Sequence, residues 1–252
     1  MVETNKNSPF PVTVILGSQW GDEGKGKIID HLSKNYDMVA RCAGGNNAGH
    51  TIVLPSGKKL DFHLLPSGLA HDGVLNVIGN GCVIHIPSLL QELENCQKWG
   101  IKDANDRLKI SSRAQLVLDC HKEIDRIQEE RKGAKSLGTT RKGIGPCYSA
   151  KANRSGVRMC DLLTKNWQNF VNLYQTIASE IQKQYPELEI DVKADIDKYA
   201  ELREQIKPMV CDTISLVNEH VFDGKKSLLI EGANENCCNI ILELTVVQVN
   251  FF

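Results

Sequence analysis

A glycine-rich loop between a predicted strand and a predicted helix constrains this chain more than any other feature. Residues 19–27 read QWGDEGKGK; they follow the apolar run 12–16 and precede an amphipathic stretch that opens at Ile28. Glycine has no side chain to keep the backbone away from a ligand, and the N–H groups that open a helix attract anions. The order of strand, glycine-rich turn and helix therefore indicates a phosphate-binding site in an α/β fold.

The charges of this loop distinguish it from a standard P-loop. The spacing G-x-x-x-x-G-K-[ST] is absent, because Lys25 is followed by Gly26 and not by a hydroxyl residue. Asp22 and Glu23 stand where anionic phosphates would approach, which is unfavourable unless Mg²⁺ bridges them or the site needs a carboxylate as a base. A glycine-rich turn with solvated charges is the alternative interpretation.

The composition argues against several other classes of protein. The chain has 252 residues, 41% hydrophobic and 24% charged, which suffices for one large domain or two small ones. A net charge of −1 offers no bulk attraction to nucleic acid or to an anionic membrane. Without a signal peptide or an apolar run long enough to span a bilayer, a cytoplasmic location is expected. Nine scattered cysteines with no C-x-x-C pair argue against a disulfide framework or a zinc site.

Predicted strands and helices alternate along most of the chain. Strands are predicted at 12–16, 37–42, 74–78 and 227–230, and a hairpin at 51–65. Helices are predicted at 87–99 with Gly100 as C-cap, at 116–131 with a solvated charged face, and over most of 166–222 with breaks at Pro186 and Pro208. This alternation predicts an α/β fold with a mostly parallel central sheet and helices on both faces. Ligands bind such sheets at the carboxyl ends of the strands.

Two further polar loops follow along the chain. Residues 43–51 are glycine-rich and come directly after a predicted strand, so they are expected to share a site with the first loop. Residues 133–145, GAKSLGTTRKGIG, are predicted as one long loop. Basic and hydroxyl side chains of this region are candidates to meet a phosphate, namely Lys132, Lys135, Thr139, Thr140, Arg141 and Lys142. A mobile, solvated loop is the alternative.

Five motifs in a fixed order resemble the adenylosuccinate synthetases. They are QWGDEGKGK, GGNNAGHT at 44–51, GTTRKGIGP at 138–146, KANRSGVR at 151–158 and EGAN at 231–234. Members of that family use GTP and Mg²⁺ to join IMP to L-aspartate, which gives adenylosuccinate, GDP and phosphate in the first committed step from IMP to AMP. The resemblance implies a P-loop-NTPase-like nucleotide site on the predicted sheet.

The resemblance also implies roles for individual residues. Asp22 would take the proton from N1 of IMP and bind Mg²⁺ together with the carbonyl group of Gly49. His50 would act as an acid toward the transferring phosphoryl group, and Lys25 would neutralise phosphate charge. The implied GTP-binding residues are Gly21, Asp22, Glu23, Gly24, Lys25, Gly26, Lys27, Gly49, His50 and Thr51. The implied IMP-binding residues are Asp22, Glu23, Gly24, Lys25, Asn47, Ala48, Gly49, His50, Thr140, Arg154 and Asn234.

A homodimer is a further implication, because Arg154 matches a residue that reaches the IMP phosphate of the neighbouring subunit. Histidines that match no catalytic position are expected to be structural: His31, His63, His71, His85, His121 and His220.

The chain departs from the family pattern after Asn234. Residues 1–234 are therefore interpreted as the N-terminal part of a single domain, and residues 235–252 as a divergent tail. A shifted reading frame would account for the change, and the segments that recognise guanine and aspartate would then be missing. The alternative function is an inactive product that binds phosphate-bearing ligands weakly or pairs with an intact subunit. A general P-loop GTPase or kinase is a third interpretation.

Overall fold

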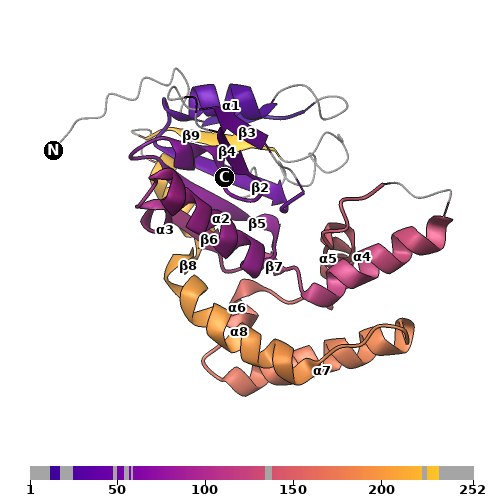
Figure 1. The fold of residues 1–252 in the computed structure, drawn as a ribbon. Helices are drawn as coiled ribbons and strands as arrows, with labels where there is room; N and C mark the ends of the chain where they lie inside the picture. The colour runs from indigo at the N-terminus through magenta and orange to yellow at the C-terminus, as the bar shows by residue number, and fades with distance from the viewer. Residues whose placement is uncertain are drawn as a thin grey trace.

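A parallel sheet forms the centre of the computed structural model, which describes residues 12–17, 25–47, 50–53, 57, 59–133, 138–222 and 226–232 (Figure 1). The strands are β1 (Val12–Ile15), β2 (Met38–Gly44), β3 (His50–Val53), β4 (Lys59–Phe62), β5 (Leu75–Ile84), β6 (Leu108–Ser111), β7 (Gln115–Leu116), β8 (Val210–Cys211) and β9 (Leu228–Glu231). The helices are α1 (Lys25–Ser33), η1 (Ser67–Ala70), α2 (Ile86–Trp99), α3 (Ala104–Arg107), α4 (Asp119–Lys132), α5 (Ile144–Ala152), α6 (Met159–Leu162), α7 (Trp167–Gln184), α8 (Val192–Ile206), η3 (Lys207–Met209) and α9 (Thr213–Phe222).

The strand order brings the first and the last described strands together. Within the described residues the sheet has seven strands in the order β1-β9-β2-β5-β6-β8, with β7 paired to β5, and each of these pairings is parallel. The register of β9 sets Glu231 beside Ile15 of β1 on one side and beside Arg41 of β2 on the other. The carboxyl ends of these three strands therefore lie at one edge, while β3 and β4 form the predicted antiparallel hairpin.

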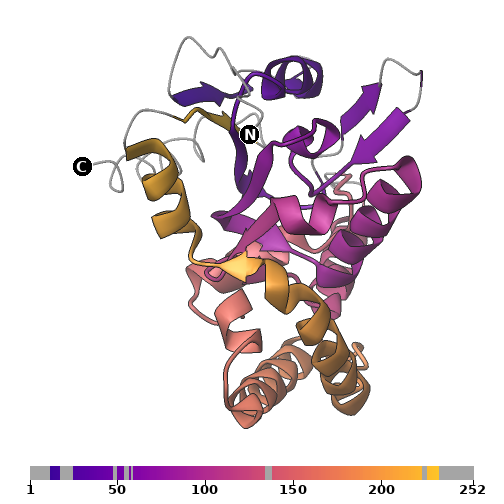
Figure 2. The same cartoon turned by 90° about the vertical axis from the view of Figure 1, so that its left-hand side faces the viewer.

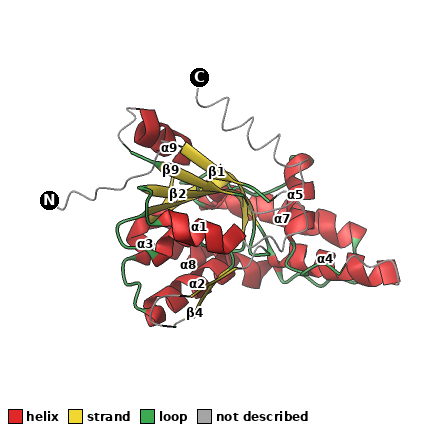
Figure 3. Ribbon diagram, turned by 90° about the horizontal axis from the view of Figure 1, so that it is seen from above, coloured by secondary structure: helices red, strands yellow, loops and turns green. Residues whose placement is uncertain are grey.

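Helices cover both faces of the sheet, as predicted (Figure 3). On one face α1 packs through Ile29 against Leu229 of β9. On the other face α9 packs through Leu216 against Leu228 of the same strand. Successive side chains of a strand point to opposite faces, so two neighbouring leucines serve two different helices.

The largest apolar core joins the sheet to the helices α7 and α8. Phe170 and Tyr174 of α7 and Tyr199 of α8 are buried in the same cluster as Ile78 and Ile110 of the sheet. The ring of Tyr199 lies 5.8 Å from those of Phe170 and Tyr174, centroid to centroid. Although α7 and α8 lie at the opposite end of the molecule from α1 (Figures 1 and 2), they are therefore continuous with the sheet through packed side chains.

Most predicted elements are confirmed, and three boundaries were wrong. The strand predicted at 74–78 continues to Ile84. The helix predicted at 116–131 begins only at Asp119, because Gln115–Leu116 pair with β5 as β7. The loop predicted at 133–145 ends earlier, since Ile144 begins α5 after Gly143 at its N-cap. Gly143 has a φ of 75°, a left-handed conformation that glycine adopts without strain.

Candidate functional site

The carboxyl end of β1 brings the first predicted site residue into place. Gly17 follows β1, and Lys25 opens α1. A Cβ atom at position 17 would overlap the terminal amine of Lys25, so the ammonium group lies directly against the backbone at the strand end. The N–H of Gly232, just after β9, donates to the carbonyl oxygen of Ile15 at 2.9 Å and holds the two strand ends together.

A buried ion pair lies beside this edge. The Nε atom of Arg41 and the Oε1 atom of Glu231 are 3.8 Å apart, and both side chains are almost fully buried. The Arg41 guanidinium also donates to the carbonyl oxygens of His63 at 2.6 Å and Gly45 at 3.4 Å. Glu231 accepts from the hydroxyl of Ser67 at 2.8 Å. A buried charge needs such partners, and here they fix the start of the loop after β2 relative to the start of EGAN.

The loop after β2 contains the predicted Asn47. Its side-chain Oδ1 accepts from the N–H of Gly45 at 3.2 Å, which tightens the turn. The carbonyl oxygen of Asn46 accepts from the Nζ of Lys142 at 2.7 Å. Farther along, the exposed Thr51 on β3 donates its hydroxyl to a carboxylate oxygen of Asp61 at 2.7 Å. Asn47 and the 138–143 segment are therefore neighbours, while the Thr51 hydroxyl is used within the β3–β4 hairpin.

Helix α5 is tied to the sheet beside the same loop. The hydroxyl of Tyr148 accepts from the N–H of Gly44 at 2.8 Å and donates to the carbonyl oxygen of Gly81 at 2.8 Å. A Cβ atom at Gly45 would lie within 3.0 Å of the side chains of Ile144 and Val83, so glycine is required for this approach. These contacts bring the segment with the predicted Thr140 to the carboxyl ends of β2 and β5.

The candidate phosphate ligands in and near the 138–143 segment differ in whether their side chains already bond to other protein groups. The hydroxyl of Thr139 donates to Asp125 at 3.0 Å, and Lys132 pairs with Glu129 at 2.7 Å. Asp125 and Glu129 are 8% and 2% exposed, so the prediction that the charges of α4 form a solvated face was wrong for these two residues. In contrast, Thr140 is exposed and makes no hydrogen bond to any described residue.

Two exposed arginines flank α5 in an unusual backbone conformation. Arg141 has a φ of 53° and Arg154 a φ of 61°. Non-glycine residues rarely adopt these left-handed values, and strain of this kind is concentrated at ligand sites. Both side chains reach solvent and form no ion pair with a described residue.

Comparison with known proteins identifies the family to which this chain belongs. The sequence model of the adenylosuccinate synthetase family matches residues 14–242. The chain belongs to the adenylosuccinate synthetase family. It is 49% identical over 231 residues to the adenylosuccinate synthetases of Saccharomyces cerevisiae and Vanderwaltozyma polyspora, which covers 88% of this chain and 53% of each relative.

Solved structures of related proteins agree with the adenylosuccinate synthetase fold. A fully ligated adenylosuccinate synthetase from Plasmodium falciparum superposes with a TM-score of 0.80 at 43% identity, over 88% of this chain and 51% of that one. A succinoaminodeoxyadenylate synthetase of cyanophage S-2L, at 18% identity and a TM-score of 0.54, shares the fold. The chain thus spans about half the length of the relatives it matches.

Several site residues expected for a family member lie outside the described residues, and so does the predicted tail 235–252. They are Gly21, Asp22, Glu23, Gly24, Ala48, Gly49 and Asn234. His50 opens β3 and is described through its backbone alone, and Gly26 and Lys27 lie in the first turn of α1. Among the described residues, no group of three or more His, Cys, Asp or Glu side chains could hold a metal ion. No helix in that part of the chain combines the length and apolar character needed to cross a bilayer.

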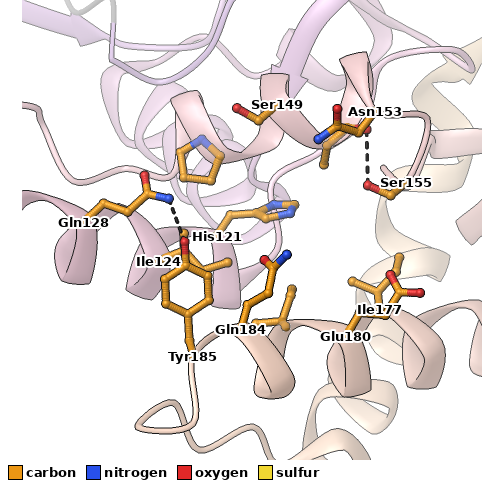
Figure 4. A pocket seen from close by; sticks show the side chains of 13 residues that line it. His121, Ile124, Gln128, Ser149, Asn153, Ser155, Ile177, Glu180, Gln184 and Tyr185 are labelled. Atoms are coloured by element: carbon orange, nitrogen blue, oxygen red, sulfur yellow. Dashed lines mark hydrogen bonds between the residues drawn. The ribbon is translucent and has the colours of Figure 1, made fainter.

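A cavity of about 200 Å³ lies between α4, α5 and α7 (Figure 4). His121 on its wall is buried, and its Nδ1 atom accepts from the N–H of Leu118 at 3.1 Å. Burial lowers the pKa of the His121 imidazole to about 4, so the ring is neutral at pH 7. Gln128 donates to the hydroxyl of Tyr185 across the rim at 2.8 Å. None of the expected synthetase site residues lines this cavity, and the hydrogen bond of His121 fits its expected structural role.

The buried side chains Arg41, Asp125 and Glu129 were not predicted as site residues. Arg41 gave a signal, since it interrupts the apolar run of β2 with a charge. Asp125 and Glu129 gave none, because they alternate with other charged residues along α4.

Proposed function

We propose that this chain supplies the phosphate-binding half of an adenylosuccinate synthetase, and that the whole protein joins IMP to L-aspartate with GTP. The family match over residues 14–242 is the observation that carries this proposal. In support, Lys25 opens α1 shortly after the carboxyl end of β1, and Asn47 lies on the loop after β2. Lys142 and Tyr148 tie the segment that contains Thr140 to that loop and to β5. Parallel sheets bind their ligands at that edge.

In the proposed reaction Asp22 removes the proton from N1 of IMP. Negative charge then builds on the 6-oxygen of the purine, which attacks the γ-phosphate of GTP; the bond between the γ-phosphorus and the bridging oxygen breaks, and GDP leaves. The amine of L-aspartate next displaces the phosphate at C6. His50 donates to the transferring phosphoryl group, and Lys25 offsets the charge of the phosphates from its place against Gly17. Positioning and electrostatic stabilisation supply most of the rate enhancement in such a transfer.

Mg²⁺ is the proposed metal. Asp22 and the carbonyl of Gly49 would hold it, and phosphate oxygens would complete its shell, because Mg²⁺ prefers hard oxygen ligands and commonly takes one or two carboxylates plus phosphates. When bound, it would balance charge on the transferring phosphate.

A homodimer is the proposed assembly. Arg154 is exposed beyond the end of α5 and keeps a left-handed backbone, so its guanidinium is free to reach an IMP phosphate in a neighbouring subunit. The cytoplasm is the proposed location.

An absorbance assay for adenylosuccinate tests the reaction directly. For the whole protein we expect turnover that needs GTP, IMP and L-aspartate together. The rate should fall by about 10²–10⁴ in Asp22→Ala, which is the range for loss of a general base. Phosphate release that does not need IMP would favour the general GTPase or kinase instead. Binding of IMP without turnover at any substrate concentration would favour the binding-only alternative.

Gly17→Ala is a second, more conservative variant for the same assay. The new methyl group would displace the Lys25 amine, which is the end of a flexible chain, so the fold should persist while the KM for GTP rises. Gly145→Ala is the matched control, because a Cβ atom there meets nothing within 4 Å. An unchanged KM for GTP in Gly17→Ala would argue against the proposed role of Lys25.

A further inference from the structure

Two buried carboxylates of α4 hold the 138–143 segment by hydrogen bonds. Asp125 accepts the hydroxyl of Thr139 on Oδ1 and the N–H of Gly143 on Oδ2, each at 3.0 Å. Glu129 accepts the N–H groups of Gly138 at 3.0 Å and Thr139 at 3.4 Å on Oε2. Four donors of one short segment thus point toward one helix.

The spacing along α4 separates these carboxylates from the solvated charges. Asp125 and Glu129 are four residues apart and share a face of the helix. Glu123 and Glu130 pair with Arg126 and are about half exposed. Burial of a carboxylate is costly unless charged or backbone donors compensate it, and hydrogen bonds from N–H groups to an ionised carboxylate are among the stronger ones. Here the donors of the 138–143 segment compensate the burial of both carboxylates. Lys132 also donates to Oε1 of Glu129 at 2.7 Å.

This arrangement divides the segment into two sides. The donors of Gly138, Thr139 and Gly143 are used by α4, and the negative charge of two carboxylates disfavours any anion on that side. The side chains of Thr140 and Arg141 stay exposed on the segment and bond to no described residue. Arg141 lies between the anchored Thr139 and Gly143 and has a left-handed backbone with a φ of 53°.

We propose that Asp125 and Glu129 are positioning residues that set the 138–143 segment so that Thr140 and Arg141 meet the 5′-phosphate of IMP. The inference rests on the proposed function, since it assigns the support of the IMP phosphate site. Neither carboxylate touches the nucleotide; each acts through the backbone and the hydroxyl of the segment.

Hydrogen exchange of the chain without ligand tests the anchoring. In Asp125→Asn and Glu129→Gln the amides of residues 138–143 should exchange about tenfold faster or more, because segment opening no longer breaks charge-assisted hydrogen bonds. Glu123→Gln, which removes an exposed carboxylate from the same helix, is the matched control and should leave this exchange unchanged. Unchanged exchange in both buried variants would overturn the anchoring.

Calorimetric titration with IMP and with inosine tests the positioning. Inosine lacks the phosphate, so the ratio of the two affinities reports the phosphate contacts alone. Asp125→Asn should lower the affinity for IMP about tenfold, because a contact with the phosphate that depends on the position of the segment is weakened. The affinity for inosine should stay unchanged. Thr139→Val removes one of the two contacts of Asp125 and should lower the affinity for IMP in the same direction. The double variant should lose little more than Asp125→Asn, because the hydroxyl of Thr139 acts only through that carboxylate. Thr139→Ser keeps the hydroxyl and should behave as the unmodified chain.

Each outcome of this titration points to one conclusion. Affinities for IMP and inosine that fall together in Asp125→Asn and Thr139→Val would show a general structural role and overturn the proposal. Unchanged affinity for IMP despite faster exchange would overturn it as well. If the unmodified chain binds IMP no better than inosine, the proposed function fails, and hydrogen exchange still decides whether α4 anchors the segment. Should Asp125→Asn not fold, Thr139→Val carries the test, because its side chain is exposed.

Discussion

His121 sits in the first turn of α4 with its ring buried and its Nδ1 atom committed to the N–H of Leu118. An imidazole that accepts through Nδ1 must leave that atom unprotonated. Protonation would remove the acceptor and place a charge in an apolar setting, which is why burial lowers the pKa from 6.5 to about 4. The same residue lies against Gly143, so its state bears on the loop that α4 supports.

A pH dependence of stability follows from this shift. The unfolded chain binds the proton near pH 6.5 and the folded chain only near pH 4, so acidification through this window favours unfolding. The loss at pH 4 should be on the order of 3 kcal/mol. Urea denaturation at a series of pH values measures it. His121→Asn can accept the same hydrogen bond without titrating and should flatten the dependence; an equal slope in both proteins would contradict the assignment.

Sequence reasoning at this scale picked out residues that stand in a distinctive setting. Lys25 and Thr140 were predicted as site residues from glycine-rich motifs; Lys25 opens α1 shortly after β1, and the roles of both residues stay predictions. Asp125 and Glu129 could not be found in this way, because their spacing along α4 repeats that of the exposed Glu123 and Glu130. Which face of a charged helix is buried depends on the segment packed against it.

Among the elements, β2 and β5 approach each other closely at two glycines of β5. Their register shifts between Arg41 and Ala43. At this point a Cβ atom on Gly81 would overlap the carbonyl oxygen of Cys42, and one on Gly79 would lie 2.9 Å from that of Arg41. Backbone atoms of a central strand cannot swing aside as the end of a side chain can. Glycine in a strand often marks such close approaches.

Gly81→Ala should therefore destabilise the protein. We expect the free energy of unfolding to fall by about 1–3 kcal/mol, the usual cost of overpacking a rigid site. In Gly145→Ala, within the first turn of α5, it should stay the same or rise by up to about 1 kcal/mol, since alanine favours helix over glycine. Chemical denaturation of both variants measures the difference, and equal stabilities would contradict the tight packing of β2 on β5.

Elements with a long apolar or periodic pattern were predictable, and short ones were not. The runs at 12–16 and 227–230 gave β1 and β9, and the helical repeat closed by Gly100 gave α2, whose C-cap has the expected left-handed φ of 99°. β7 and β8 have two residues each, too few to show a period. The start of α5 at Ile144 was missed because glycines on both sides suggested a loop.

For the molecule as a whole, one apolar cluster links layers that look separate in outline. Phe170 stacks on Trp167 at 4.8 Å between ring centroids and contacts the ring of Tyr199, within the cluster that also contains Ile78 of β5. A shared core of this kind favours unfolding in one cooperative step.

Phe170→Ala tests that cooperativity. The loss of a buried aromatic ring should lower the free energy of unfolding by about 3–5 kcal/mol. The unfolding midpoints measured by far-ultraviolet circular dichroism and by tryptophan fluorescence, to which Trp99 in α2 and Trp167 in α7 contribute together with Trp20, should shift together. Ile28→Ala, at a side chain that is 52% exposed, should change little. Midpoints that separate in Phe170→Ala would mean that the α7 and α8 layer unfolds alone.

At this scale the sequence indicated the edge of the sheet where we propose the site, but not which strands are neighbours at that edge. Parallel strands place their carboxyl ends together whatever their order, so the loops after β1 and β2 were expected to share a site. The insertion of β9 between β1 and β2 joins residues far apart in the chain, and no local pattern reports such a pairing.

The hydroxyl of Tyr148 takes a backbone N–H from β2 and returns a hydrogen bond to a backbone carbonyl of β5. The hydroxyl therefore bridges the two strands, close to the point where their register shifts. Helix α5 is thus connected to the sheet by side-chain hydrogen bonds to the backbone of two strands. If α5 moves away from the sheet, the hydrogen bonds of Tyr148 to both strands break. We therefore expect local opening of α5 and of the ends of β2 and β5 to occur together.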